Sequence, residues 1–450
     1  MQTQKDHVHA YQFMMQRMTT ALVVGDPSNT EMPTKRGRSG MAIGAVIALL
    51  VVIGFGVFGL IVPGGNTAYK QKGAILVEKE SGTRYVFVQG RLMSTPNLAS
   101  AMLVQGDQSK VVLISRASLA GLPHGPRIGI EGAPDTVPRG GELLPGAWVL
   151  CPAAVEGSNA PGMSVNMDER VQTTAVPQER YVPVRSADGK TFLLWRGAKH
   201  LVPDVGALVV LGLASTTPPV VPDTMLGILP DGPALSAAVV PNAGRPGQAV
   251  AGRPTKIGDV FTHHPGNSTE QRYVLLDRGL SPLSATEFAL LAANADNPPV
   301  EIDAASILTA PFSPDNSYLS RLPDLVGQQQ VDPKAGTPCL RQAGAGTDVS
   351  TTVVLATGTD RWPAVSQAGA LVSPNRGLLV AELPIPAGQK IPNRFLITDR
   401  GKRYAIPDNE SIQALGLGGV QPVPIRTEVL STIPTGPVLS RTAVVVEQGG

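Results

Sequence analysis

The stretch "LGILPDGPALS", residues 226–236, indicates a repeated structure, because it occurs again almost unchanged as "LSTIPTGPVLS" at residues 430–440. A third version, "LAGLPHGPRI", covers residues 119–128. A fourth, "ILTAPFSPDN", covers residues 307–316 and has Ser313 in place of the glycine. Proline restricts φ and glycine tolerates close or left-handed backbone, so a Pro-x-Gly-Pro sequence favours a defined turn. Four copies predict a structural unit used four times.

A strand signal led by an aromatic residue lies upstream of each copy. The four signals are "RYVFVQG" from Tyr85, "TFLLWRG" from Phe192, "RYVLLDRG" from Tyr273 and "RFLITDRG" from Phe395. The first proline of the turn follows that aromatic residue after 38, 38, 38 and 39 residues. Such regular spacing is typical of structural repeats. We expect the repeats at residues 69–128, 181–240, 256–314 and 393–445.

Each expected repeat contains a helix start between its strands and its closing turn. The candidate N-cap residues are Asn97, Asp204, Ser284 and Asp408. Asn, Asp and Ser are favoured there because their side chains accept hydrogen bonds from the free N–H groups of the first turn. A unit of two strands and one helix is too small to close a core alone. The repeats are therefore expected to pack on one another or on a central domain.

A second level of repetition links the two cysteines of the chain. Tyr85 and Tyr273 are 188 residues apart, and so are Cys151 and Cys339. The chain therefore reads as a duplication, and equivalent positions meet where they lie near a pseudo-two-fold axis. We expect a Cys151–Cys339 disulfide across that axis, the alternative being two free buried thiols.

The predicted fold class is α+β. The segments 129–180 and 315–392 contain "GAWVLCP" and "TTVVLATGTDRW" and are expected to form the two halves of a central mixed, mainly β core. Four small α/β repeats around that core, with pseudo-two-fold symmetry, give an elongated region. The length of 450 residues agrees with several domains.

One segment, residues 41–62, is apolar and long enough to cross a membrane as a single helix. A buried core helix or a cleaved signal peptide fits less well, because about forty polar residues precede it. Lys35, Arg36 and Arg38 stand on its N-terminal side, which predicts a cytoplasmic N-terminus and an extracytoplasmic location for everything after Pro63. A disulfide persists in that compartment.

The first 40 residues are expected to form a cytoplasmic amphipathic helix and a flexible link over residues 27–40. The apolar positions of the helix recur at spacings of three and four and form one stripe. They are Val8, Tyr11, Met15, Met18 and Leu22. A lone helix needs a partner protein or the membrane surface to cover such a stripe, and a partner is favoured because the polar face is not rich in lysine.

Composition and motifs exclude several functions. The formal net charge is +2 and charged residues make up 16% of the chain, which does not fit nucleic-acid binding. Gly189-Lys190-Thr191 looks like the end of a Walker A loop, but Val184 stands where that motif needs glycine. Asp188-Gly189 fits a hairpin turn better.

Histidine and carboxylate residues do not form a recognisable catalytic or metal-binding set. The adjacent pair His263-His264 lacks metal-ligand spacing, and we expect it in a solvated loop. No G-x-S-x-G or H-E-x-x-H motif is present. We therefore predict no enzyme activity, no cofactor and no metal.

Taken together, these features resemble the EccB family, the single-pass membrane component of type VII (ESX) secretion systems of actinobacteria. The resemblance rests on "AYQFMMQRMTTALVVGDP" before the membrane span and "GGNTAY" after it. It also rests on "RLMSTPNLASAMLV" and "LPHGPRIGIEGAPDTVP" in the first expected repeat. "GAWVLCP" and "TPCL" match the cysteine positions of the family.

The resemblance implies a structural component of the secretion complex in the inner membrane, with most of the chain in the periplasm. It implies a periplasmic dimer, membrane partners similar to EccC, EccD and EccE, and an attached mycosin-like protease. An ATPase activity has been proposed for the family, although no nucleotide-binding motif stands in this chain. The alternative is a membrane-tethered envelope enzyme, for example a nucleotide hydrolase, or a cell-wall binder. That alternative would need aromatic platforms, and the chain has three tryptophans, Trp148, Trp195 and Trp362.

Overall fold

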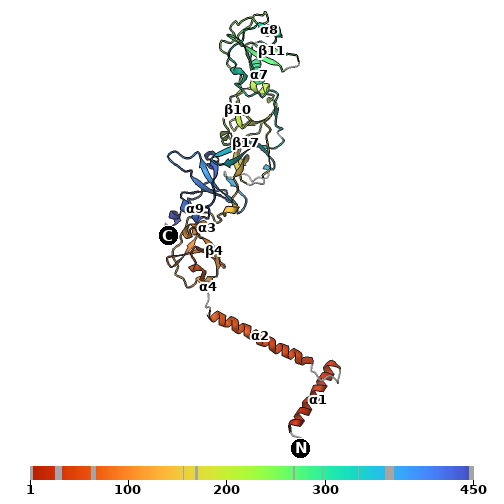
Figure 1. Ribbon diagram of the computed structural model, residues 1–450, viewed down its shortest axis with the longest axis vertical. Coiled ribbons are helices and arrows are strands. Elements are labelled where there is room, and N and C mark those ends of the chain that lie inside the picture. Colours follow the sequence, from red (N-terminus) through yellow and green to blue (C-terminus); the bar gives the residue numbers. More distant parts are fainter. Residues whose placement is uncertain are drawn as a thin grey trace.

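The molecule is long and narrow, with two helices at one end and small sheets stacked along its axis (Figure 1). The structure is a computed structural model. It describes residues 4–25, 33–61, 67–155, 157–167, 171–266, 269–295, 297–332, 334–359 and 369–444.

The two N-terminal helices are α1 (Gln4–Val24) and α2 (Pro33–Ile61). Proline is favoured in the first turn of a helix, where its missing N–H is not needed, and α2 begins at Pro33. The flexible link expected over residues 27–40 is therefore wrong for 33–40, and residues 26–32 lie outside the described part. Within α2, Gly37–Gly59 is long and apolar enough to cross a membrane, and none of it is buried.

The first sheet follows the membrane helix in the chain and has the order β3-β2-β1-β4. It is preceded by the short helix η1 (Thr67–Lys70). Its strands are β1 (Ala74–Glu78), β2 (Arg84–Val88), β3 (Arg91–Thr95) and β4 (Lys110–Ile114). The helix α3 (Leu98–Gln105) precedes β4, and α4 (Arg116–Leu119) follows it. β1 to β3 form an antiparallel meander, and β4 lies parallel to β1.

Three further four-stranded sheets have the same arrangement, a meander with a fourth strand parallel to its first. The second sheet contains β8 (Arg180–Arg185), β9 (Thr191–Trp195), β10 (Ala198–Val202) and β15 (Gln329–Gln330). The third contains β11 (Val260–His263), β12 (Gln271–Leu276), β13 (Gly279–Pro282) and β14 (Val300–Glu301). The fourth contains β19 (Gly377–Leu383), β20 (Arg394–Thr398), β21 (Arg403–Ile406) and β22 (Val423–Arg426).

Two of these sheets use strands from the range expected to be central core. β19 and β15 both lie within residues 315–392, yet β19 pairs with β20 and β22, and β15 pairs with β8. The expected boundary at residue 393 therefore falls inside the fourth sheet. The long loops carry the remaining short helices. They are η2 (Gly140–Glu142), α5 (Val205–Val210), α6 (Asp223–Ile228), α7 (Ala285–Asn294), α8 (Ala304–Thr309), η3 (Ser317–Leu319), α9 (Asn409–Ala414), α10 (Thr427–Leu430) and α11 (Arg441–Val444).

The four predicted helix starts are confirmed by side-chain caps. Each N-cap side chain accepts a hydrogen bond from the backbone N–H three residues on, at 2.7 to 3.1 Å. The caps are Asn97 of α3, Asp204 of α5, Ser284 of α7 and Asp408 of α9. The polar residues at these places therefore begin helices and have no need of a catalytic explanation.

The Pro-x-Gly-Pro turns close the sheets by adding to the edge of the third strand. In each sheet the first turn proline accepts a backbone hydrogen bond from that strand at 2.7 to 3.0 Å, and the turn residue two places later donates one back at 2.8 to 3.0 Å. The strand residues are Leu92, Lys199, Leu280 and Arg403, which bridge His124, Asp231, Phe312 and Thr435. The closing turn therefore serves to pair with the edge of the third strand in each outer sheet.

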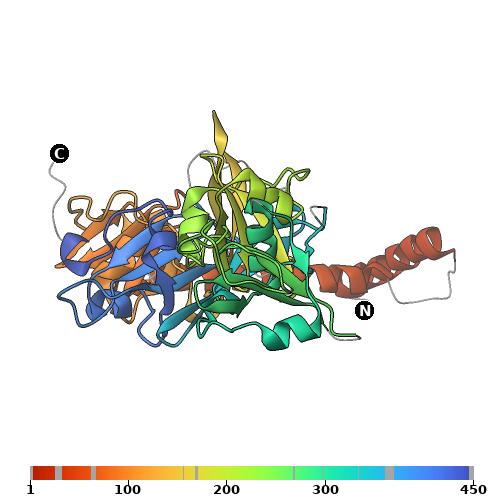
Figure 2. The same ribbon diagram turned by 90° about the horizontal axis from the view of Figure 1, so that it is seen from above.

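The sheets pack in pairs that are not consecutive in the chain. α3 of the first sheet packs on α9 of the fourth, and α5 of the second packs on α7 of the third. From above, the orange and blue parts of the chain share one side and the green parts the other (Figure 2). Asp135 adds ion pairs to Arg84, at 3.4 Å, and to Arg400, at 3.1 Å, between the first and fourth sheets.

The central sheet lies between these two pairs and has the order β18-β6-β5-β16-β17-β7. Its strands are β5 (Ala147–Val155), β6 (Ser158–Asn166), β7 (Thr173–Ala175), β16 (Thr337–Ala345), β17 (Asp348–Ala356) and β18 (Ala370–Leu371). The largest buried cluster joins it to the second and fourth sheets and includes Leu226 and Leu430. Leu226 lies in helix α6 and Leu430 ends helix α10, and these two helices pack together.

Candidate functional site

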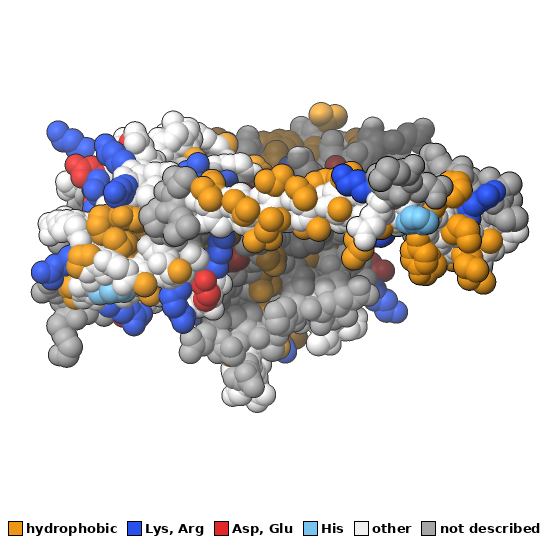
Figure 3. Space-filling model, turned by 90° about the horizontal axis from the view of Figure 1, so that it is seen from below, with side chains coloured by type: hydrophobic (Ala, Val, Ile, Leu, Met, Phe, Trp, Pro, Cys, Tyr) orange, Lys and Arg blue, Asp and Glu red, His pale blue; other side chains and the backbone are white. Residues whose placement is uncertain are grey.

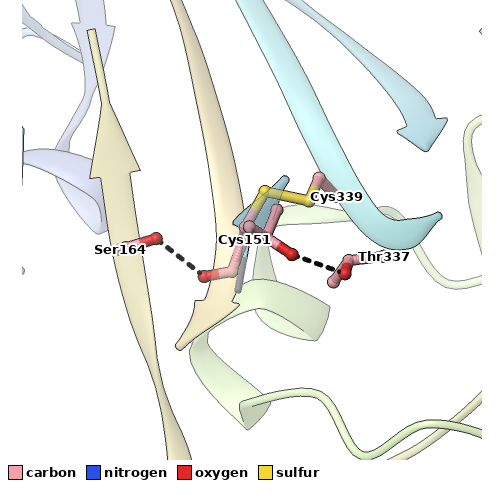
Figure 4. The surroundings of a disulfide bond; sticks show 5 residues. Cys151, Ser164, Thr337 and Cys339 are labelled. Carbon is pink, nitrogen blue, oxygen red and sulfur yellow. Dashed lines mark hydrogen bonds between the residues drawn. A yellow bond between two sulfur atoms is a disulfide. The ribbon is translucent and has the colours of Figure 1, made fainter. Parts of the chain in front are cut away.

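The two cysteines meet at the middle of the central sheet. Leu150 of β5 lies opposite Leu340 of β16, and one residue further along the register a disulfide joins Cys151 to Cys339 with a Cα–Cα distance of 4.5 Å. Directly opposed residues of antiparallel strands have the short separation that a disulfide needs. Figure 4 shows the bridge lying between the two strands.

The environment of the disulfide is buried and apolar. Cys151 and Cys339 are both fully buried and pack with Val149, Val354 and Ala356. The Ser164 hydroxyl donates to the Cys151 carbonyl at 3.3 Å (Figure 4). A bridge between residues 188 apart restricts a long stretch of the unfolded chain, which stabilises the fold by about 2–5 kcal/mol. Its role in this position is structural.

A buried polar contact between β5 and β16 was not predicted from the sequence. The Trp148 indole N–H donates to the Gln342 side-chain oxygen at 2.9 Å, and both residues are buried. Gln342 in turn donates to Thr351 at 3.1 Å. The sequence of β16 alone does not show that the Gln342 side chain points into the core. That depends on the register between β16 and β5.

The tryptophans do not form a ligand platform in the described part of the chain. Trp148 is inside the core, and the Trp195 indole N–H donates to the Gln178 carbonyl at 3.0 Å while Arg196 stacks on its ring at 4.3 Å. Trp362 lies outside the described residues. A cell-wall binder would present exposed aromatic faces, so the described tryptophans give that alternative no support.

The Walker-like stretch is a hairpin turn, as predicted. Lys190 lies between β8 and β9, and its ammonium contacts the Asp188 carboxylate at 2.6 Å. Hydrogen bonds from Lys190 and Ser186 lower the pKa of Asp188 to about 2. A phosphate-binding lysine needs a glycine-rich loop ahead of a helix, whereas Lys190 precedes a strand and is paired with a carboxylate.

The expectation of a solvated loop is wrong for His263 and agrees with the structure for His264, which is exposed and follows the strand. His263 ends strand β11, is buried, and its Nδ1 is 2.9 Å from the Ile302 carbonyl oxygen. His264 is exposed and lies 3.3 Å from Glu301 and 3.4 Å from Glu270. The two adjacent histidines therefore have different surroundings, one inside the third sheet and one at the surface. Within the described residues, no cluster of His, Cys, Asp and Glu could hold a metal ion.

Helix α1 presents its apolar side chains to solvent. The predicted stripe is 51% to 84% exposed at every position, namely Val8, Tyr11, Met15, Met18 and Leu22. Met14 extends the same face, and Phe13 lies on the other side of the helix with Arg17 stacked over its ring. Figure 3 shows these apolar side chains, and those along α2, uncovered on one side of the molecule.

The described residues contain one helix that is long and apolar enough to span a membrane, followed by a stack of small sheets with a buried disulfide. These features define a class, membrane proteins anchored by one helix. The family model described as "Type VII secretion system ESX-1, transport TM domain B" matches residues 1–450. The chain belongs to this family and is a structural membrane component of an ESX type VII secretion system.

Curated relatives have similar length. The "ESX-1 secretion system ATPase EccB1" of Mycobacterium tuberculosis is 26% identical over 99% of this chain and 95% of its own length. The "ESX-3 secretion system ATPase EccB3" of Mycolicibacterium smegmatis is 26% identical over 97% of this chain and 89% of its own. Both carry ATPase in their names.

Solved structures share the fold. A chain of an intact ESX-5 inner membrane complex matches with a TM-score of 0.65 and 23% identity, covering 100% of this chain and 96% of that one. A chain of the EccB3 dimer from the ESX-3 core complex matches with a TM-score of 0.61 and 24% identity, covering 83% of this chain and 100% of that one.

Proposed function

We propose that the chain scaffolds the secretion complex, anchored by α2 and dimerising through the region that follows it. Support comes from the family match over the whole chain and from a fold made of sheets locked together by buried contacts. The similar solved chains come from an inner membrane complex and from a dimer. The single observation that carries the proposal is the disulfide-linked central sheet, whose buried cluster contacts one sheet of each outer pair.

The proposed partners are membrane subunits similar to EccC, EccD and EccE, with a mycosin-like protease attached. The contact for the cytoplasmic partners is the exposed stripe of α1, residues 8–22. Covering these apolar side chains lowers the free energy of the protein, because a partner then removes them from water. Mild detergent extraction followed by identification of co-purified subunits tests this assembly, and deletion of residues 1–25 should abolish the cytoplasmic contacts. Purification of the chain alone under these conditions contradicts the scaffold proposal.

We further propose that the N-terminus is cytoplasmic and the sheets periplasmic. Lys35, Arg36 and Arg38 flank the apolar segment on its N-terminal side, and basic residues are retained in the cytoplasm. The disulfide requires an oxidising compartment on the other side. Labelling of cysteines introduced at exposed positions in α1 and in the sheets, with a membrane-impermeant maleimide, distinguishes the two orientations.

The four outer sheets are proposed to be repeats related by a pseudo-two-fold axis through the disulfide. The order of the central sheet reads the same from either edge when β5, β6 and β7 are exchanged with β16, β17 and β18. Cys151 and Cys339 are opposed in the register and are also 188 residues apart, the spacing of the duplication. Only a pair on the axis satisfies both conditions.

The names of the relatives raise nucleotide hydrolysis as a second candidate function. The region most similar to a nucleotide-binding loop is the hairpin at Lys190, whose ammonium is already paired with Asp188. A hydrolysis assay on the purified full chain, with Lys190→Ala as the comparison, tests this candidate. Activity that disappears in Lys190→Ala would assign hydrolysis to this hairpin and overturn the structural interpretation of it.

A further inference from the structure

Within the described residues, the first sheet has a longer open strand edge than the other outer sheets. β4 is five residues long and pairs on one side with β1, while nothing in the described part of the chain pairs with its other side. Residues Lys110, Val112 and Ile114 direct their backbone groups toward β1, as shown by the hydrogen bonds from the Lys110 N–H to Gly73 and from the Lys79 N–H to Ile114. The backbone groups of Val111 and Leu113 therefore point outward.

The side chains at those two positions make the edge apolar. Val111 is 49% exposed and Leu113 is 58% exposed, and both lie on the same face because residues two apart in a strand do. An open strand edge with exposed aliphatic side chains is a template for pairing with another strand.

The equivalent edges elsewhere are covered or very short. In the fourth sheet, Val423 of β22 packs closely against Gly146 and Gly344 of the central region. β14 and β15 have only two residues each, and β14 carries the charged Glu301. The opposite edges of the outer sheets are occupied by the closing turns. β4 is thus the longest uncovered strand edge of the outer sheets within the described residues.

We propose that two copies of this chain pair through β4, antiparallel about a two-fold axis at Val112, and join their first sheets into one continuous sheet. This inference rests on the proposed dimer and names its contact. The strand is self-complementary: with the axis at Val112, Val111 of one copy lies opposite Leu113 of the other. Both residues have outward backbone groups, so each such pair exchanges two hydrogen bonds. The exposed aliphatic side chains then meet across the new strand pair.

Two further observations favour a second copy as the occupant. No like charges oppose each other in this register, since Lys110 lies opposite Ile114. The first sheet is also the sheet nearest to α2 in the molecule, so the paired edge lies at the end of the stack of sheets that is close to the membrane helix (Figure 1). Isologous contacts of this kind close after two subunits.

The register makes a specific cross-linking prediction. Val112 lies opposite its own counterpart as a non-hydrogen-bonded pair, where Cα atoms are about 4.5 Å apart and a disulfide is allowed. The full chain carrying Val112→Cys should therefore form a covalent dimer on mild oxidation in detergent. Val111→Cys is the matched control on the same strand, and it should stay largely monomeric because it lies opposite Leu113. Mixing Val111→Cys with Leu113→Cys chains should restore the covalent dimer.

A disruption experiment gives an independent readout. Val111→Lys with Leu113→Lys places like charges across the pair and should convert the dimer to monomer by mass measurement in detergent. Val205→Lys with Val209→Lys, at exposed positions 73% and 61% accessible on α5, should leave the dimer unchanged. Thermal unfolding of both variants shows whether each still folds.

The outcomes separate this contact from the proposed function. A wild-type dimer without Val112→Cys cross-linking overturns pairing through β4 and leaves the scaffold intact. A wild-type monomer that still co-purifies with membrane subunits overturns the dimer alone. A third outcome is that the Val111→Lys, Leu113→Lys variant no longer co-purifies with the membrane subunits and Val112→Cys does not cross-link. This outcome overturns the proposal, because it shows that the β4 edge binds a different protein.

Discussion

The ring of Tyr404 lies so close to Gly436 that a Cβ on this glycine would fall 2.2 Å from the ring carbon Cε1. The second sheet has the same relationship, since a Cβ on Gly232 would fall 2.1 Å from Cε1 of His200. The glycine of the closing turn is therefore required by the ring that covers it. Backbone conformation does not require it, because neither glycine has a positive φ.

The missing glycine of the third copy is explained by the same contact. Ser313 stands in the turn, and the residue in the place of the ring is Ser281, a small side chain whose hydroxyl donates to the Asp315 carbonyl at 2.5 Å. The first sheet is intermediate, with a flexible Met93 about 3.1 Å from where a Cβ of Gly125 would be. Turn residue and facing residue are matched in size in all four sheets.

Gly436→Ala is expected to destabilise the protein by about 1–3 kcal/mol, because the added methyl group forces the Tyr404 ring out of its position. Gly125→Ala is the matched control and should cost less, since the Met93 side chain can move. Thermal unfolding of the full chain in detergent measures both. The double variant Gly436→Ala, Tyr404→Ser should lose less stability than the sum of the losses in the two single variants. Strictly additive losses would contradict the packing explanation.

His200 is expected to make stability depend on pH. Burial lowers the pKa of His200 below its ordinary value of 6.5, and the hydrogen bond with the Pro233 carbonyl opposes that effect only in part. The folded state therefore binds fewer protons than the unfolded state. His200 therefore makes its full contribution to the free energy of unfolding above pH 6.5. This contribution is lost as the pH drops through 6.5 toward the folded-state pKa of His200.

His200→Tyr, which places in the second sheet the residue found in the fourth, should make the unfolding temperature fall less between about pH 8 and pH 5. Val209→Thr, at an exposed position of α5, is the control, because it removes no titratable group and should leave the wild-type slope. A His200→Tyr slope equal to that of the wild type would show that His200 does not titrate on unfolding in this range.

Local features could be predicted from the sequence because they depend on neighbouring residues. Asp204 and Asp408 cap helices, Asp188 and Gly189 form a hairpin turn, and these follow from short-range hydrogen bonds and backbone preferences. The Cys151–Cys339 pairing could be predicted as well, because the chain has only two cysteines and their spacing of 188 residues equals that between Tyr85 and Tyr273.

Long-range pairing could not be predicted in the same way. The repeat spacing does not say which sheets share a core, and the first sheet packs on the fourth. Gln329 and Gln330 of β15 have no strand pattern, and β19 lacks the aromatic residue that marks one strand in each outer sheet. The role of Ser281 could be understood only once the pairing of its strand with the closing turn was known.

The contact between the second and third sheets depends on a buried ion pair. The Glu287 carboxylate is fully buried and accepts hydrogen bonds from Arg321 at 2.7 and 2.8 Å and from the Ala238 N–H at 3.1 Å. Arg321 also donates to the Ser236 carbonyl at 2.6 Å, at the end of the quoted stretch. The pair joins α7 to the chain that leaves the second sheet.

Glu287→Ala should destabilise the protein by about 3 kcal/mol, because it leaves the guanidinium and the Ala238 N–H without their acceptor. The effect should be local, so hydrogen exchange should rise in residues 237–258 and in the third sheet before it rises in the central sheet. Glu301→Ala, at an exposed carboxylate, is the control and should change neither quantity. Uniform loss of protection over all sheets would contradict a local joint.

Removal of the disulfide should lower the free energy of unfolding by about 2–5 kcal/mol, since the bridge restricts the unfolded chain between Cys151 and Cys339. Cys151→Ala with Cys339→Ala should therefore unfold at a lower temperature than the oxidised wild type. Reduced wild type is the matched control: a reductant should lower its unfolding temperature toward that of the double variant and should not affect the variant. If the reductant leaves the wild type unchanged and peptide mapping finds both thiols free, the bridge does not form in the membrane-extracted protein, and the central sheet holds its two halves by packing alone.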